Sequence, residues 1–122
     1  MIKGSCLCGG ITFSINGKPE AASHCHCRMC QKQHGAAYAT YARFARSQIE
    51  YHSGQELLAS YNSSADVMRR FCKVCGANVE WGYEQQRPEK VAIAVGLFDT
   101  EFDFPVTVDL HLESKASWLR GD

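Results

Sequence analysis

Short runs of alternating apolar and polar residues, separated by turn-forming residues, occupy most of the chain. Between Gly10 and Ile15 this alternation leads into Asn16-Gly17, a pair that is typical of tight hairpin turns. Further runs of the same kind predict short strands over residues 37–44, 49–52, 57–61, 68–71, 78–83, 90–95 and 106–112. Helical patterns do not alternate with these runs, so we expect a mainly β, antiparallel fold.

One short segment predicts a helix. It begins near Cys27 and ends by Gly35, because a glycine just after a helical run is a common C-terminal stop. No repeat, linker or low-complexity stretch interrupts the sequence. A chain of 122 residues with this pattern is expected to form a single domain over residues 1–122.

The charge balance disfavours polyanionic partners. Lys and Arg number 13, Asp and Glu also number 13, and the formal net charge is zero, whereas proteins that bind nucleic acids usually carry a basic excess. The apolar run near residues 91–98 is too short to span a membrane, and residues 1–5 leave no room for the apolar core of a signal peptide. We therefore expect a cytoplasmic protein that binds neither nucleic acid nor membrane.

All seven cysteines fall into three compact groups. The groups are Cys6-Leu7-Cys8, Cys25-His26-Cys27-Arg28-Met29-Cys30 and Cys72-Lys73-Val74-Cys75. In a reducing compartment such spacings favour metal binding over disulfides, and an odd number of cysteines would leave one thiol unpaired. Buried free thiols that act only as small hydrophobes have no reason to cluster in this way. Zinc, which thiolates bind in a tetrahedron, is the expected cofactor.

The simplest division of the seven ligands is four plus three. The first and third groups supply Cys6, Cys8, Cys72 and Cys75 to one closed, structural zinc site. Cys8 and Cys75 are each followed by glycine, which lets the backbone bend so that an N–H can approach a thiolate. This pairing predicts that one zinc joins two distant parts of the chain.

The middle group supplies three ligands to a second zinc site: Cys25, Cys27 and Cys30. Catalytic zinc sites keep a free position for water or substrate, so a three-thiolate site indicates catalysis. The alternative is a closed structural site in which a nearby histidine is the fourth ligand, and the candidates for it are His24, His26 and His34.

Three thiolates also favour one kind of chemistry. They donate more electron density than imidazoles, which makes zinc a poorer Lewis acid and disfavours hydrolysis by zinc-bound water. Zinc does deprotonate a thiol that coordinates it. The second site is therefore better suited to binding the sulfur of a substrate thiol.

These motifs resemble the glutathione-dependent formaldehyde-activating (GFA) family, which includes the centromere protein V type domain. The resemblance rests on residues 6–9, 25–30, 70–76 and the C-terminal 113–118, and it covers nearly the whole chain. It implies a β-tent fold, a structural zinc on Cys6, Cys8, Cys72 and Cys75, and a catalytic zinc on Cys25, Cys27 and Cys30. The family reaction, which joins formaldehyde to glutathione, is that of a carbon–sulfur lyase.

A thiol such as glutathione carries carboxylates that need cationic partners. Arg28 and Lys115 are the expected contacts; Lys32, Arg69 and Arg70 are weaker candidates. His26 is the expected acid–base residue, with His34 as an alternative.

His111-Leu112-Glu113 resembles the H-x-E of zinc deaminases, but both C-x-x-C pairs precede it and neither follows a proline. The sequence therefore predicts a zinc-dependent carbon–sulfur lyase that acts on a small thiol and a small aldehyde. The alternative is a non-catalytic zinc module that carries a thiol or binds a protein partner.

Overall fold

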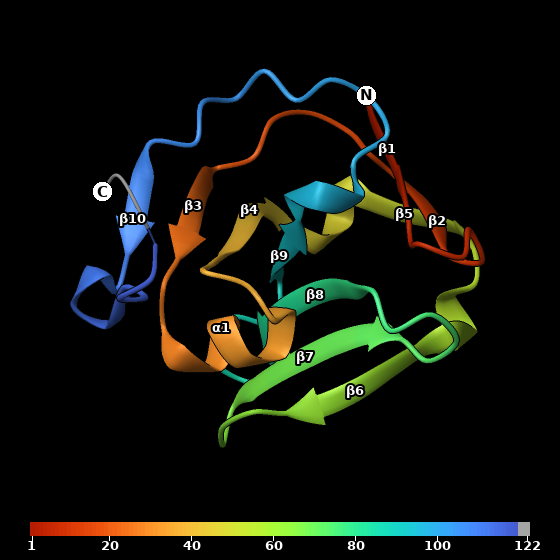
Figure 1. Cartoon of the computed structure of the whole chain (residues 1–122). Coiled ribbons are helices and arrows are strands. Elements are labelled where there is room, and N and C mark those ends of the chain that lie inside the picture. Colours follow the sequence, from red (N-terminus) through yellow and green to blue (C-terminus); the bar gives the residue numbers. More distant parts are fainter. Residues whose placement is uncertain (120–122) are drawn as a thin grey trace.

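The structure, a computed structural model, describes residues 1–119 and contains two β-sheets and one short α-helix (Figure 1). The strands are β1 Ile2–Ser5, β2 Thr12–Ile15, β3 Ala21–Cys25, β4 Ala39–Ala45, β5 Ile49–Ser53, β6 Leu58–Asn62, β7 Val67–Cys72, β8 Asn78–Tyr83, β9 Lys90–Ala94 and β10 Val108–Leu110. The helix α1 spans Arg28–His34, and 3₁₀ turns span Arg46–Gln48, Gln55–Leu57, Val95–Leu97 and Leu112–Ser114. Within residues 1–119 no helix is both long and apolar enough to cross a membrane.

The smaller sheet has the order β1-β2-β5 and the larger one the order β10-β3-β4-β9-β8-β7-β6. The main core lies between the small sheet and the middle of the large one. Phe13 and Ile15 from β2 pack with Phe44 from β4 and Ile93 from β9, and all four side chains are buried. β9 is buried at four successive positions, Val91 to Ala94, and its alternate residues belong to two different core clusters, so this strand has core on both of its faces.

The predicted mainly β fold is confirmed, and so is the helix. Cys27 is the N-cap of α1, and its side chain accepts a hydrogen bond from the backbone N–H of Cys30. Gly35 ends the helix in the left-handed conformation, at φ 59°. The predicted strands agree with the observed ones to within a few residues.

One pair of strands differs from the predicted antiparallel arrangement. β10 pairs with β3 in parallel, with Val108 beside Ser23 and Leu110 beside Cys25. In Figure 1 the segment before β10 crosses over the top of the molecule before it reaches β3. This long connection makes the parallel pairing possible, because a parallel neighbour cannot be reached through a tight hairpin.

The sequence pattern also missed two strands, β1 and β3. The sequence of β3 is Ala-Ala-Ser-His-Cys, which has no β-branched or aromatic residue. β3 is nonetheless held between β4 and β10 in the large sheet. Its hydrogen-bonded neighbours, rather than its own strand propensity, therefore keep it extended.

A buried carboxylate joins the two sheets. The Glu80 side chain on β8 is only 3% exposed, and its Oε1 lies 3.1 Å from Arg46 Nη1 and 3.0 Å from Arg70 Nη1. Its other oxygen accepts a short hydrogen bond from the hydroxyl of Tyr51 on β5. Burial, followed by the charge of Glu80, raises the pKa of Tyr51, so the phenol stays protonated and continues to donate.

We predict that Glu80→Gln lowers the free energy of unfolding by about 2–3 kcal/mol, because it removes charge-assisted hydrogen bonds from a buried site. Urea unfolding of the zinc-loaded protein measures the change. The matched control is Glu20→Gln, which removes a partly exposed carboxylate paired with Arg43 and Lys90 and should cost less than about 1 kcal/mol. Equal losses in the two variants would contradict this role for Glu80.

Candidate functional site

The first and third cysteine groups meet, as the sequence predicts. Cys6 and Cys8 follow β1, Cys72 ends β7 and Cys75 lies in the turn before β8. The sulfur atoms of Cys6 and Cys8 are 3.6 Å apart, and those of Cys8 and Cys72 are 3.9 Å apart. A zinc–sulfur bond of about 2.3 Å places the sulfurs of a tetrahedral site about 3.8 Å apart. All four sulfurs lie within 4.8 Å of one another, so the four thiols could hold a metal ion such as zinc.

Each half of this site has a glycine in the left-handed conformation after its second cysteine. Gly9 has φ 78° and Gly76 has φ 81°, and both values favour glycine. The N–H of Gly9 donates to the carbonyl of Cys6, and the N–H of Gly76 donates to that of Cys72. The backbone N–H of Ala77 and then that of Cys8 hold the pKa of Cys75 at about 6. Each glycine thus turns the chain back onto the first cysteine of its own group, over three residues in the first group and over four in the third.

The second group, which we call the three-thiol cluster, consists of Cys25, Cys27 and Cys30. Cys25 ends β3, and the other two cysteines lie at the start of α1. Their sulfur atoms all lie within 4.8 Å of one another. The hydrogen bond from Cys30, opposed by burial, lowers the pKa of Cys25 to about 5. This cluster can therefore hold a metal ion through three thiolates.

The histidines weighed as a fourth ligand have other partners. His24 Nδ1 lies 2.8 Å from Thr40 Oγ1, and His34 Nε2 lies 2.9 Å from Tyr41 Oη. His26 is buried and donates from Nε2 to Asp109 Oδ1 at 2.8 Å. Within residues 1–119 none of these three histidines shares the metal-ligand spacing of the three-thiol cluster.

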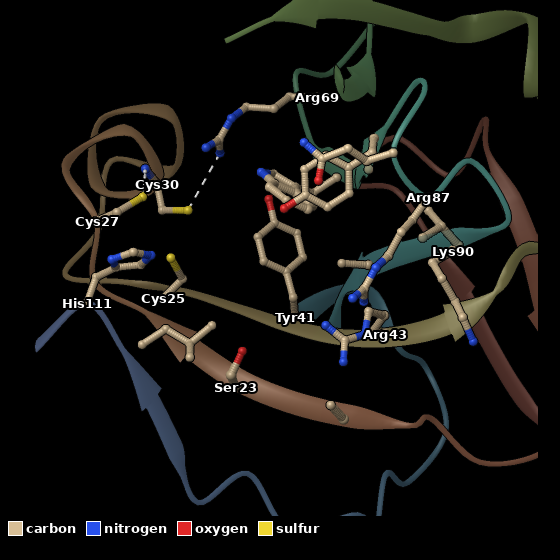
Figure 2. A pocket seen from close by; sticks show the side chains of 18 residues that line it. Ser23, Cys25, Cys27, Cys30, Tyr41, Arg43, Arg69, Arg87, Lys90 and His111 are labelled. Carbon is tan, nitrogen blue, oxygen red and sulfur yellow. Dashed lines mark hydrogen bonds between the residues drawn. The ribbon is translucent and has the colours of Figure 1, made fainter. Parts of the chain in front are cut away.

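A different histidine, His111, lies beside the cluster. It lines the same pocket as Cys25, Cys27 and Cys30, and Figure 2 shows its ring next to the Cys25 sulfur. Its Nδ1–H donates to Glu113 Oε2 at 3.2 Å. Among residues 1–119 it alone, apart from glycines, has a positive φ, of 59°. Such strain in a non-glycine residue is frequent at functional sites.

The H-x-E motif that contains His111 was visible in the sequence, but it resembled the motif of zinc deaminases and did not indicate a place beside the cysteines. The residue reaches the cluster because β10 pairs with β3 and carries Leu110 beside Cys25. The hydrogen bond between His26 and Asp109 also joins β10 to the segment between Cys25 and Cys27. This long-range pairing gives no local sequence signal.

The three-thiol cluster lies at one end of a pocket of about 410 Å³ (Figure 2). Its lining includes four cationic side chains, from Arg43, Arg69, Arg87 and Lys90, and no Asp or Glu of the described residues. Aromatic walls come from Tyr41, Trp81 and Tyr83. The pocket can therefore take an anionic molecule whose reactive end reaches the thiols.

The structure does not bring the two predicted substrate-binding cations into this pocket. Arg28 is exposed at the start of α1, and its guanidinium donates to Gln31 Oε1. Lys115 is partly buried and is likewise absent from the pocket lining. Lys32 is exposed on α1, and Arg70 bonds to Glu80. Of the weaker candidates, only Arg69 lines the pocket.

Comparison with known proteins identifies the family. Residues 1–114 match the model of the glutathione-dependent formaldehyde-activating enzyme (GFA) family. The chain is 26% identical over 110 residues to an uncharacterized lyase of Schizosaccharomyces pombe, a match that covers 88% of this chain and 78% of that protein. A crystal structure of a Rhodobacter sphaeroides protein has the same fold, with a TM-score of 0.67 and 22% identity over 83% of this chain and 91% of that one. The chain belongs to the GFA family, as its cysteine motifs predict.

The two cysteine clusters should differ when their ligands are removed. We predict that Cys72→Ser loses one zinc and most of the stability of the fold, because binding of a structural zinc supplies about 10 kcal/mol or more of folding free energy. Cys27→Ser should lose the other zinc and keep the fold. Metal analysis by mass spectrometry together with thermal unfolding measures both effects. A fold that survives Cys72→Ser but not Cys27→Ser would reverse the assignment.

Proposed function

We propose that this protein is a zinc-dependent carbon–sulfur lyase, which forms or cleaves the adduct of a small thiol and a small aldehyde. Glutathione and formaldehyde are the proposed substrates, as the family's name suggests. One observation supports this most: a three-thiol cluster lies within a cationic pocket, and among residues 1–119 no fourth cysteine or histidine lies at ligand spacing from it. Such an arrangement suits a substrate that carries both a thiol and carboxylates.

Cys25, Cys27 and Cys30 would hold the catalytic zinc, and Cys6, Cys8, Cys72 and Cys75 the structural one. When bound, the catalytic zinc would supply a position at which a thiol binds as its thiolate. The α1 turn supports this role, because the Cys30 N–H donates to Cys27 Sγ at 3.3 Å and fixes the direction of that sulfur.

The pocket cations would bind the carboxylates of the thiol. Arg43 and Lys90 lie 3.1 Å from the same carboxylate oxygen of Glu20, so part of their charge is already compensated. Arg87 forms no ion pair with a carboxylate among residues 1–119 and is exposed at the pocket. We therefore propose Arg87 as the main carboxylate contact, in place of Arg28.

His111 is our candidate for the proton-transfer residue. Adduct formation makes a carbon–sulfur bond, removes the thiol proton and leaves the aldehyde oxygen in need of a proton. An imidazole beside the thiols can accept the first proton and donate the second. Nδ1 of His111 donates to Glu113, so Nε2 is the ring nitrogen that can exchange a proton with the substrate. His26 is the acid–base residue that the sequence predicts. It would instead position β10 through its hydrogen bond to Asp109.

The first test is the rate of adduct exchange measured by NMR with glutathione and formaldehyde. We predict that the zinc-loaded protein raises this rate above the uncatalysed one and that Cys27→Ser removes the increase. Glutathione should also react faster than 2-mercaptoethanol, which has no carboxylates for the pocket cations. Thiol binding without any change in rate would favour the non-catalytic carrier. A protein that neither bound the thiol nor raised the rate would contradict both proposals.

The second test separates the chemistry of His111 from its structural role. We predict that His111→Gly lowers the catalysed rate by about 100-fold, since it removes a general acid–base group. The fold should be as stable or more stable, because glycine suits the positive φ at this position. Added imidazole should restore part of the rate. The control is His52→Ala, whose side chain contacts Ser14 on the small sheet and should leave the rate unchanged. Full activity in His111→Gly would overturn the assignment.

A further inference from the structure

Arg69 has an unusual set of partners for a buried cation. The residue is 3% exposed, yet it forms no ion pair with any Asp or Glu of residues 1–119. Its Nε donates to Ser63 Oγ at 2.8 Å, and its Nη1 donates to Gln33 Oε1 at 2.7 Å. The same Nη1 lies 3.6 Å from Cys30 Sγ, the contact drawn as a dashed line in Figure 2.

The neighbouring arginine, Arg70, is paired with a carboxylate, as buried cations usually are. Arg70 lies on the same strand and forms an ion pair with the buried carboxylate of Glu80 at 3.0 Å. A buried charge is costly unless an opposite charge accompanies it. For Arg69 the opposite charge can come only from the three-thiol cluster, because its other partners are a hydroxyl and an amide. Arg69 and Cys30, which are both buried, therefore form one electrostatic unit at the inner side of the cluster.

The cluster is suited to carry negative charge. Coordination to a metal ion keeps cysteine thiols deprotonated, so three ligand thiols would together carry three negative charges. An arginine guanidinium stays charged throughout the pH range in which proteins are folded, and that of Arg69 contacts one of these thiols.

This charge matters for the ligand that occupies the free position. A divalent metal with three thiolates has a net charge of about −1, so a further anion must bind against that negative charge. A guanidinium in contact with one of the thiolates offsets the repulsion. A neutral ligand meets no repulsion and gains nothing from the guanidinium. Ser63 and Gln33 fix the Arg69 side chain, which cannot turn away to bind a substrate carboxylate.

We infer that Arg69 makes the free position of the three-thiolate metal site select anionic ligands, thiolates in particular, over neutral ones. This inference rests on the metal site of the proposed function and adds to it a residue that determines specificity. It assigns Arg69 a different task from Arg87, which lies at the exposed part of the pocket. Arg69 acts on the sulfur end of the substrate and Arg87 on its carboxylates.

The test uses the cobalt-substituted protein, whose visible absorption bands report ligands at the free position. The probes are azide as a small anion and imidazole as a neutral ligand. We predict that Arg69→Gln weakens azide binding by about 10- to 100-fold, the equivalent of one lost charge-assisted contact, and changes imidazole binding by less than about threefold. Arg70→Gln, which leaves the cluster contacts intact, should bind both ligands as the wild type does.

The absorption of the four-thiolate cobalt site serves as the control for folding. Equal azide affinity in Arg69→Gln and wild type would overturn the inference. An equal loss of azide and imidazole would assign Arg69 a purely structural role and overturn it as well. Since only binding is measured, these outcomes are independent of whether the protein accelerates adduct formation.

A second measurement needs no variant and therefore does not depend on the folding of Arg69→Gln. The wild-type cobalt protein should bind 2-mercaptoethanol, with release of its thiol proton to the buffer. The S-methyl ether of the same compound, which cannot become an anion, should leave the spectrum unchanged. Comparable binding of the ether would contradict anion selectivity at this position.

Discussion

The approach of four sulfur atoms from two distant segments determines much of this structure. Cys8 and Cys72 are 64 residues apart in sequence, and their sulfurs are 3.9 Å apart. This contact holds the loop after β1 against the end of β7, so it fastens the small sheet to the outer strands of the large one. A metal ion at this point closes a long loop in a domain with a small core, where such a restraint contributes most to stability.

Strand β7 links the four-cysteine cluster to the candidate active site. β7 ends at Cys72, and three residues earlier it presents Arg69 to Cys30. The opposite edge of the three-thiol cluster is set by β10, which is fastened to β3 by its parallel pairing and by the bond between His26 and Asp109. The cluster thus lies between β10, at one edge of the large sheet, and β7, the strand next to its other edge. Its geometry depends on the fold as a whole, although its ligands lie within a six-residue motif.

The sequence predicted features that depend on neighbouring residues. Cysteine spacing identified both clusters, because a single turn brings the sulfurs of each short group together, and seven cysteines in three groups divide most simply into four and three. Alternation identified most strands, and Gly35 identified the end of α1. What the sequence missed depends on distant contacts: the extended Ala-rich β3, the parallel β10 and the pocket cations Arg43 and Arg87. These cations come from β4 and from the loop before β9, so no local motif connects them to the cysteines.

We propose that the three-thiol cluster binds a metal with one position open to a thiol. X-ray absorption at the zinc edge, with and without glutathione, distinguishes an open position from a closed one. Seven cysteine ligands over two zinc ions should give seven sulfurs and one oxygen or nitrogen in total before glutathione is added. With glutathione the account predicts that the light atom is replaced by an eighth sulfur. A nitrogen ligand that persists in saturating glutathione would mean that a histidine closes the site, and would contradict the account.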